Sequence, residues 1–164
     1  MKKSSRHSKI TGDFAEALVL YWLSKHGYEC VRVDHTGIDL NARPPDGSEL
    51  LGISVKCRSR YDGSEGNDVT LPHKGFDEAR KACKAFGCVP YFAIVVDTTE
   101  SVQCFLLSLS HLDSVAGVGS TKRFWRMTKR AVDQYERDPL IQRFDLQTRA
   151  CSWREKDAKR GPVP

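Results

Sequence analysis

The sequence predicts an α/β fold in which helices flank a mixed β-sheet. Segments with helical and strand-like patterns follow one another in the order αβββαββ, and a C-terminal helical extension comes after them. An unbroken apolar run at residues 91–96 is typical of a strand buried on both faces in the middle of such a sheet. The length of 164 residues fits a single domain.

The first helix is expected at residues 9–27. Phe14, Leu18, Tyr21 and Trp22 are spaced so that a helix would place them on one apolar stripe, and a glycine follows at the end. The eight residues before this helix contain three basic side chains and no acid, so we expect a flexible basic arm at 1–8. The polar C-terminal residues 151–164 are expected to be loose, which leaves 9–150 as the folded domain.

Three strands are expected next, at residues 28–33, 37–43 and 50–58. The second and third are separated by Pro-Pro-Asp-Gly at 44–47, a strong turn signal. These two strands should therefore form an antiparallel hairpin.

The rest of the chain continues the alternation. A polar, glycine-rich loop is expected first, then a helix, the apolar central strand, its partner strand and two further helices. These segments are the loop 59–72, the helix 73–87, the strands 91–96 and 102–107, and the helices 110–116 and 126–137.

The charge is unevenly distributed. The net charge is +5; residues 1–10 contribute +4 and residues 121–132 contribute +5, so the other residues sum to −4. If the basic segments converge on one face, they would attract nucleic acid.

No apolar run approaches the ~18–20 residues that a membrane span needs, and no secretory signal is recognisable. The six cysteines are scattered without a Cys-x-x-Cys pair, which favours reduced thiols over a zinc site or disulfides. We therefore expect a cytoplasmic protein with no membrane partner.

Polar side chains occur where the predicted sheet should be buried. Strand alternation places Ser54, Lys56 and Arg58 on one face of the third strand, and the hairpin can bring Asp39 close to them. Glu16 lies among apolar residues in the middle of the first helix, where it could press against the sheet. A carboxylate and an ammonium inside a sheet are costly unless they are paired or bind a metal.

These residues resemble a known family. The runs Gly12-x-x-x-Glu16, Gly37-Ile38-Asp39-Leu40 and Ile53-Ser54-Val55-Lys56 resemble the motifs of the PD-(D/E)xK nuclease superfamily, in particular its restriction-endonuclease-like and Holliday-junction-resolvase-like members. The resemblance covers about residues 9–107. It implies a restriction-endonuclease-like sheet, hydrolysis of DNA phosphodiester bonds with Mg²⁺ or Mn²⁺ as cofactor, and the homodimer that many such nucleases form.

The resemblance also implies roles for single residues. Asp39, Glu16 and the Val55 backbone carbonyl would hold the metal. Lys56 would position the attacking water and offset phosphate charge, which makes it an electrostatic stabiliser rather than a general base. Ser54 stands where the family has an acid or glutamine and is a poor ligand, but Mg²⁺ is commonly held by one or two protein carboxylates.

Basic residues outside the motifs are candidate phosphate contacts: Arg58, Arg60, Lys122, Arg123, Arg126, Lys129 and Arg130. The same cations could instead belong to a solvated helix face. Two other functions remain open from the sequence: a catalytically degenerate nucleic-acid-binding or assembly module of the same fold, and a simple protein-interaction domain.

Overall fold

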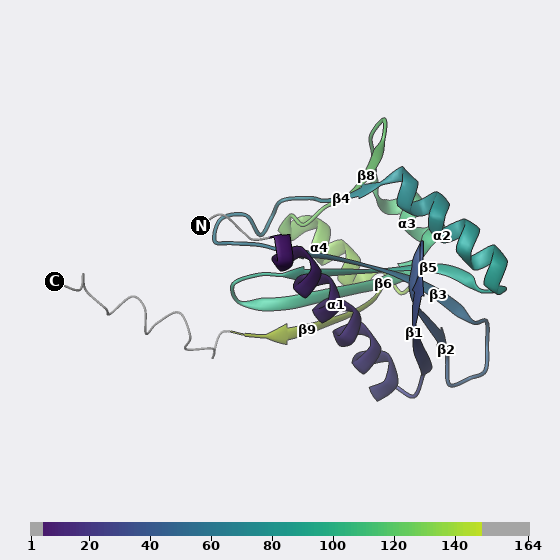
Figure 1. The fold of residues 1–164 in the computed structure, drawn as a ribbon. Helices are drawn as coiled ribbons and strands as arrows, with labels where there is room; N and C mark the ends of the chain where they lie inside the picture. The colour runs from purple at the N-terminus through teal and green to yellow at the C-terminus, as the bar shows by residue number, and fades with distance from the viewer. Residues whose placement is uncertain (1–4, 149–164) are drawn as a thin grey trace.

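A computed structural model describes residues 5–148 and shows helices packed on both faces of a mixed sheet (Figure 1). The main sheet contains, in order across it, β1 (Glu29–His35), β2 (Ile38–Arg43), β3 (Leu51–Ser59), β5 (Val89–Asp97), β6 (Ser101–Ser108) and β9 (Gln142–Gln147). A smaller sheet contains β4 (Val69–Pro72), β8 (Lys122–Trp125) and β7 (Gly117–Val118). The helices are α1 (Ser5–Lys25), α2 (His73–Phe86), α3 (Leu109–Val115) and α4 (Lys129–Arg137).

The predicted hairpin and central strand are confirmed. β2 pairs antiparallel with β3, and β3 pairs in parallel with β5, which in turn pairs antiparallel with β6. Residues 92–96 of β5 are at most 1% exposed. Phe92, Ile94 and Val96 pack with residues of α2 and α3, whereas Ala93 and Val95 pack with residues of α1. Each face of the sheet therefore has its own apolar core.

Helix α1 differs from the prediction in its start and in its buried face. It begins at Ser5, so residues 5–8 belong to the helix and not to an arm, while residues 1–4 lie outside the described part of the chain. The buried positions are Ala15, Leu18, Val19 and Leu23. The predicted stripe was wrong for Phe14 and Tyr21, which are 44% and 60% exposed, because two apolar patterns run along this helix and only one faces the sheet.

The predicted 59–72 loop and the C-terminal region contain strands that the sequence did not indicate. The end of the loop forms β4, which pairs with β8, and β9 pairs with β6 at the edge of the main sheet. Trp125 of β8 is fully buried and stacks on Tyr135 of α4, with ring centroids 3.9 Å apart. The predicted helix at 126–137 begins only at Lys129, because the Thr128 hydroxyl caps it by accepting from the Ala131 N–H.

The cysteines within the described residues are free thiols. No helix in this range is long and apolar enough to cross a membrane. The predicted tail at 151–164 lies outside residues 5–148.

Candidate functional site

The candidate site lies where β2 separates from β3. The two strands pair from Leu40 to Ala42, and the next residue toward the start of β2 is Asp39. Its Oδ2 accepts a hydrogen bond of 2.6 Å from the Val55 N–H. The Asp39 carboxylate therefore takes the place that a β2 carbonyl would have in a continued ladder, at a fork between the strands.

The Val55 carbonyl faces the same fork. In an extended strand the N–H and C=O of one residue point toward the same neighbouring strand, and the Val55 N–H points toward Asp39. The Asp39 Oδ1 makes no hydrogen bond within the described residues and is free to bind a ligand. Two hard oxygen donors, one charged and one neutral, are thus brought to one point.

Glu16 and Asp39, the two carboxylates that the resemblance names as metal ligands, both line one surface hollow. This hollow has a volume of about 270 Å³, and its wall also includes Asp13, Arg32 and His35. Glu16 comes from α1 and Asp39 from β2, so the hollow opens between the helix and the start of the fork. The two carboxylates give it acidic character.

Arg32 is the residue that sequence reasoning missed. Its Nη2 lies 2.8 Å from Glu16 Oε2 and also donates to the Asp13 carbonyl at 3.3 Å. Arg32 is on β1, opposite Leu40 of β2, and this pairing turns it toward α1. A side chain on an edge strand can point to either face of the sheet. Nothing in the sequence indicated that Arg32 points to the face where Glu16 lies.

Ser54 lies on the opposite face of the sheet from the hollow. It is 1% exposed and is the register partner of Phe92, whose side chain packs with α2. Its hydroxyl therefore does not line the hollow that contains Asp39 and Glu16.

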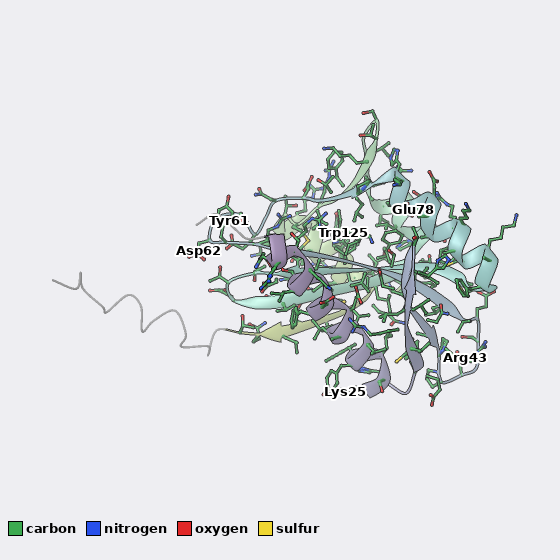
Figure 2. The ribbon with its side chains drawn as sticks, in the orientation of Figure 1. Lys25, Arg43, Tyr61, Asp62, Glu78 and Trp125 are labelled. Atoms are coloured by element: carbon green, nitrogen blue, oxygen red, sulfur yellow. The ribbon has the colours of Figure 1, made fainter. Side chains whose placement is uncertain are left out.

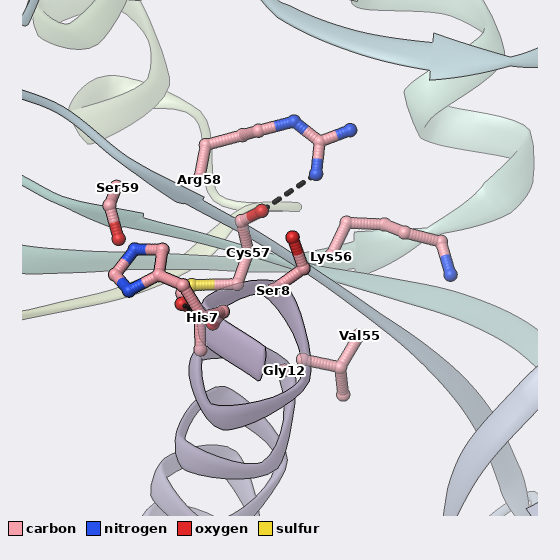
Figure 3. A pocket seen from close by; sticks show the side chains of 9 residues that line it. His7, Ser8, Gly12, Val55, Lys56, Cys57, Arg58 and Ser59 are labelled. Carbon is pink, nitrogen blue, oxygen red and sulfur yellow. Dashed lines mark hydrogen bonds between the residues drawn. The ribbon is translucent and has the colours of Figure 1, made fainter. Parts of the chain in front are cut away.

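Lys56 lies on the same face as Ser54, as predicted, and is half-buried beside Ile94. Val55 and Cys57 pack instead toward α1. Figure 3 shows the Lys56 ammonium extending away from α1, while Val55 lies beside Gly12. No carboxylate within residues 5–148 forms an ion pair with its Nζ. Glu16 and Lys56 thus lie toward opposite faces of the sheet.

A second hollow of about 340 Å³ lies between the beginning of α1 and the end of β3 (Figure 3). His7, Ser8, Thr11 and Gly12 form one wall, and residues 55–59 form the other. Burial is the main cause that raises the pKa of the Cys57 thiol to about 11, and the nearby Asp97 adds to it. Cys57 is therefore a neutral thiol near pH 7 and a poor nucleophile.

The residues at the fork fit a hard divalent cation. Mg²⁺ and Mn²⁺ prefer oxygen ligands, and Mg²⁺ usually keeps several waters beside one or two carboxylates. Asp39, Glu16 and the Val55 carbonyl supply that type of donor. No three His, Cys, Asp or Glu side chains of the described chain gather closely enough to hold a metal by themselves. A bound ion would therefore depend on these two carboxylates, the carbonyl and water.

The predicted phosphate contacts divide into two groups. Arg60 and Arg123 are bonded to other parts of the protein. The Arg60 guanidinium donates to the Asn67 and Asp68 carbonyls. Arg123 forms an ion pair of 3.2 Å with Asp113, and its side chain is 21% exposed. The structure does not favour them as free contacts. The others are exposed on the surface: Arg58, Lys122, Arg126, Lys129 and Arg130.

Two of the basic segments adjoin. The Arg58 guanidinium donates to the Cys57 carbonyl at 2.7 Å and reaches the Thr70 carbonyl of β4 at 3.4 Å. Thr70 is the register partner of Phe124 in β8. The end of β3 and the basic segment around β8 are therefore neighbours through the small sheet.

No family model matches the chain, and no curated protein is significantly similar to it in sequence. Solved structures similar to it include Hjc, a Holliday junction resolvase from the archaeal hyperthermophile Archaeoglobus fulgidus. The TM-score is 0.55 at 17% identity, over 75% of this chain and 88% of that one. At this identity the similarity establishes the fold, which is restriction-endonuclease-like.

Proposed function

We propose that this protein is a Mg²⁺- or Mn²⁺-dependent endonuclease that hydrolyses DNA phosphodiester bonds, acting in the cytoplasm and as a homodimer. The observation that carries the proposal is the position of Asp39. Its carboxylate lies at the fork of β2 and β3, bonded to the Val55 N–H, in the same hollow as Glu16. The restriction-endonuclease-like fold, similar to that of a Holliday junction resolvase, supports this assignment.

The chemistry needs negative charge to hold a cation and positive charge to stabilise the phosphate. A bound divalent ion lowers the pKa of a water and offsets charge on the phosphoryl oxygens. Asp39, Glu16 and the Val55 carbonyl would hold it. The Lys56 ammonium, which has no carboxylate partner in the described chain, is available to stabilise negative charge on the phosphate. Glu16 would exchange Arg32 for the ion.

The test is cleavage of labelled linear, single-stranded and branched DNA with Mg²⁺ or Mn²⁺. We expect Asp39→Asn and Lys56→Met each to reduce the rate by roughly 100-fold or more, since removing one electrostatic stabiliser costs about that much. The matched controls are Asp46→Asn, in the exposed 44–47 turn, and Lys25→Met, at the end of α1; both should cleave normally. Undiminished cleavage by the Asp39 and Lys56 variants would refute the assignment.

A second candidate is a nucleic-acid-binding module that has lost catalysis. Two observations favour it: Ser54 supplies no carboxylate and does not line the hollow, and Glu16 is paired with Arg32. Titration with Mn²⁺ separates the candidates. Binding that Asp39→Asn abolishes supports the nuclease, whereas salt-sensitive DNA binding without any metal binding supports the module. Sedimentation with and without DNA tests the homodimer.

A further inference from the structure

Tyr61 is an exposed aromatic side chain in a hydrogen-bonded turn. It is 72% exposed. Its backbone is nevertheless fixed: the Tyr61 N–H donates to the Ser64 hydroxyl at 3.0 Å, and that hydroxyl donates back to the Tyr61 carbonyl at 2.7 Å. Ser64 itself is 3% exposed. The ring is therefore held outward by a buried hydrogen-bonded turn.

The segments on either side of Tyr61 are anchored as well. The Arg60 N–H donates to the Asp97 carbonyl at 2.6 Å, which ties the loop to the end of β5. The Arg60 guanidinium donates to the Asn67 and Asp68 carbonyls at 3.0 and 2.9 Å, which closes the loop. The backbone of such a loop needs little further ordering when its side chain binds a ligand.

The position of Tyr61 places it near the second hollow, at the end of β3 away from Asp39. It follows Ser59, which lines the 340 Å³ hollow together with Lys56 and Arg58, and two residues span at most about 7 Å. Figure 2 places Tyr61 at the outer edge of the molecule, on the side where α1 begins.

Charge around the loop sets the direction in which a DNA strand could pass. Asp62, Glu65 and Asp68 lie on the loop itself and would repel phosphates, whereas Arg58 would attract them. A strand bound with its backbone toward Arg58 would keep its phosphates away from these carboxylates and would present a base on the Tyr61 side.

From these observations we propose that Tyr61 is a base-stacking platform, and that the protein binds DNA at an unpaired nucleotide next to the second hollow. The inference rests on the proposed DNA-directed function. An aromatic ring stacks on any base whose face is free, whereas neighbours in a duplex cover both faces of a paired base. The substrate would accordingly be duplex DNA that contains a gap, an overhang or a branch with an unpaired base.

The experiment measures equilibrium binding without cleavage, in EDTA and at fixed salt, by fluorescence anisotropy. The DNA probes are a fully paired duplex and a duplex of equal length with a central gap that carries 2-aminopurine. We expect Tyr61→Ala to weaken binding to the gapped DNA roughly 5- to 150-fold, the range for one lost stacking contact, and to leave binding to the paired duplex nearly unchanged.

Two further variants make the result specific. Tyr61→Phe keeps a stacking ring and should bind the gapped DNA like the wild type. Tyr21→Ala removes a tyrosine of α1 that is 60% exposed and should have no effect. Quenching of 2-aminopurine fluorescence on binding should require an aromatic residue at position 61, a signal that a structural role would not produce.

The stacking proposal is overturned if Tyr61→Ala binds gapped DNA within twofold of the wild type, or if the wild type binds neither probe. Its failure is distinguishable from failure of the proposed nuclease. Tyr61-dependent binding without any cleavage would refute only the nuclease, and Asp39-dependent cleavage with normal Tyr61→Ala binding would refute only the stacking role.

Discussion

Gly37 offers a sharp test of the geometry that positions Asp39. It precedes β2 by one residue, and its φ of +102° is a backbone conformation that L-residues rarely adopt. A Cβ at this position would lie against the Glu78 carbonyl oxygen, 2.5 Å from the Glu78 carbonyl carbon and 2.9 Å from the Ala79 nitrogen. These are backbone atoms of α2, so a side chain could not be accommodated by a rotamer change.

The cost of Gly37→Ala has two parts. A positive φ costs an alanine about 1–2 kcal/mol, and overpacking against a fixed backbone adds about 1–3 kcal/mol. The free energy of unfolding should therefore fall by roughly 2–5 kcal/mol, which lowers the Tm by roughly 4–20 °C for a chain of this size. Urea unfolding followed by circular dichroism should show a lower midpoint with an unchanged slope.

Two other glycines are matched controls. Gly47 has a φ of +72° with no atom within 4 Å of a built Cβ, so Gly47→Ala should cost about 1–2 kcal/mol at most. Gly12 lies in α1 and also has open space, so Gly12→Ala should stabilise the protein by about 0.5–1 kcal/mol. If Gly37→Ala and Gly47→Ala destabilise equally, the close approach of α2 to the Gly37 turn is refuted.

Three further outcomes are expected. Trp125→Ala should reduce the free energy of unfolding by about 3–5 kcal/mol in urea, because it empties a fully buried, stacked position. The hydrogen bond from the Leu140 N–H and, after it, the interaction with His111 lower the pKa of the Asp138 carboxyl. The stability that the Asp138 carboxylate contributes is therefore present above pH ~4 and is lost as the pH falls below that value. The Tm of Asp138→Asn should accordingly depend less steeply on pH in the acid range. Burial raises the pKa of the Cys104 thiol, so Cys104 should react with Ellman's reagent only after unfolding, which stopped-flow absorbance would detect.

The fold was predictable from the sequence where apolar patterning was unambiguous. The run at 91–96 has no polar residue, and the hairpin turn at 44–47 carries both proline and glycine; both predictions were confirmed. Strand β9 was missed because its sequence is mostly polar. Phe144 is its one buried residue, which is sufficient for an edge strand but does not create a pattern that a single sequence can show.

Strand β8 was not predicted because its segment is rich in basic residues. Four cations at 122–129 suggested the approach to a basic helix, but Trp125 between them is fully buried. Burial of that ring depends on α4 folding over it, which is a tertiary event. For the same reason the sequence could not show that Arg123 is paired with Asp113 and is not free to bind phosphate. Asp113 comes from α3 and is also paired with Arg80 of α2.

The sequence pointed to the two acids of the candidate site but not to the arginine that pairs with one of them, Arg32. Asp39 and Glu16, which the family resemblance singled out, line one hollow. The partner of Glu16 depends on the register of β1, which shifts between Arg32 and His35. Irregular pairing of this kind has no sequence signature, so Arg32 emerged only from the structure.

The Arg32–Glu16 pair, more than Ser54, bears on whether the fork can bind a metal. Ser54 faces the core beside Phe92, so it neither supplies nor blocks a ligand in the hollow. Arg32 does compete for Glu16, but the two side chains are 48% and 28% exposed. Ion pairs in such surroundings contribute about 0–1 kcal/mol, which a divalent cation between two carboxylates can exceed. A pair this weak does not by itself prevent Glu16 from binding a metal.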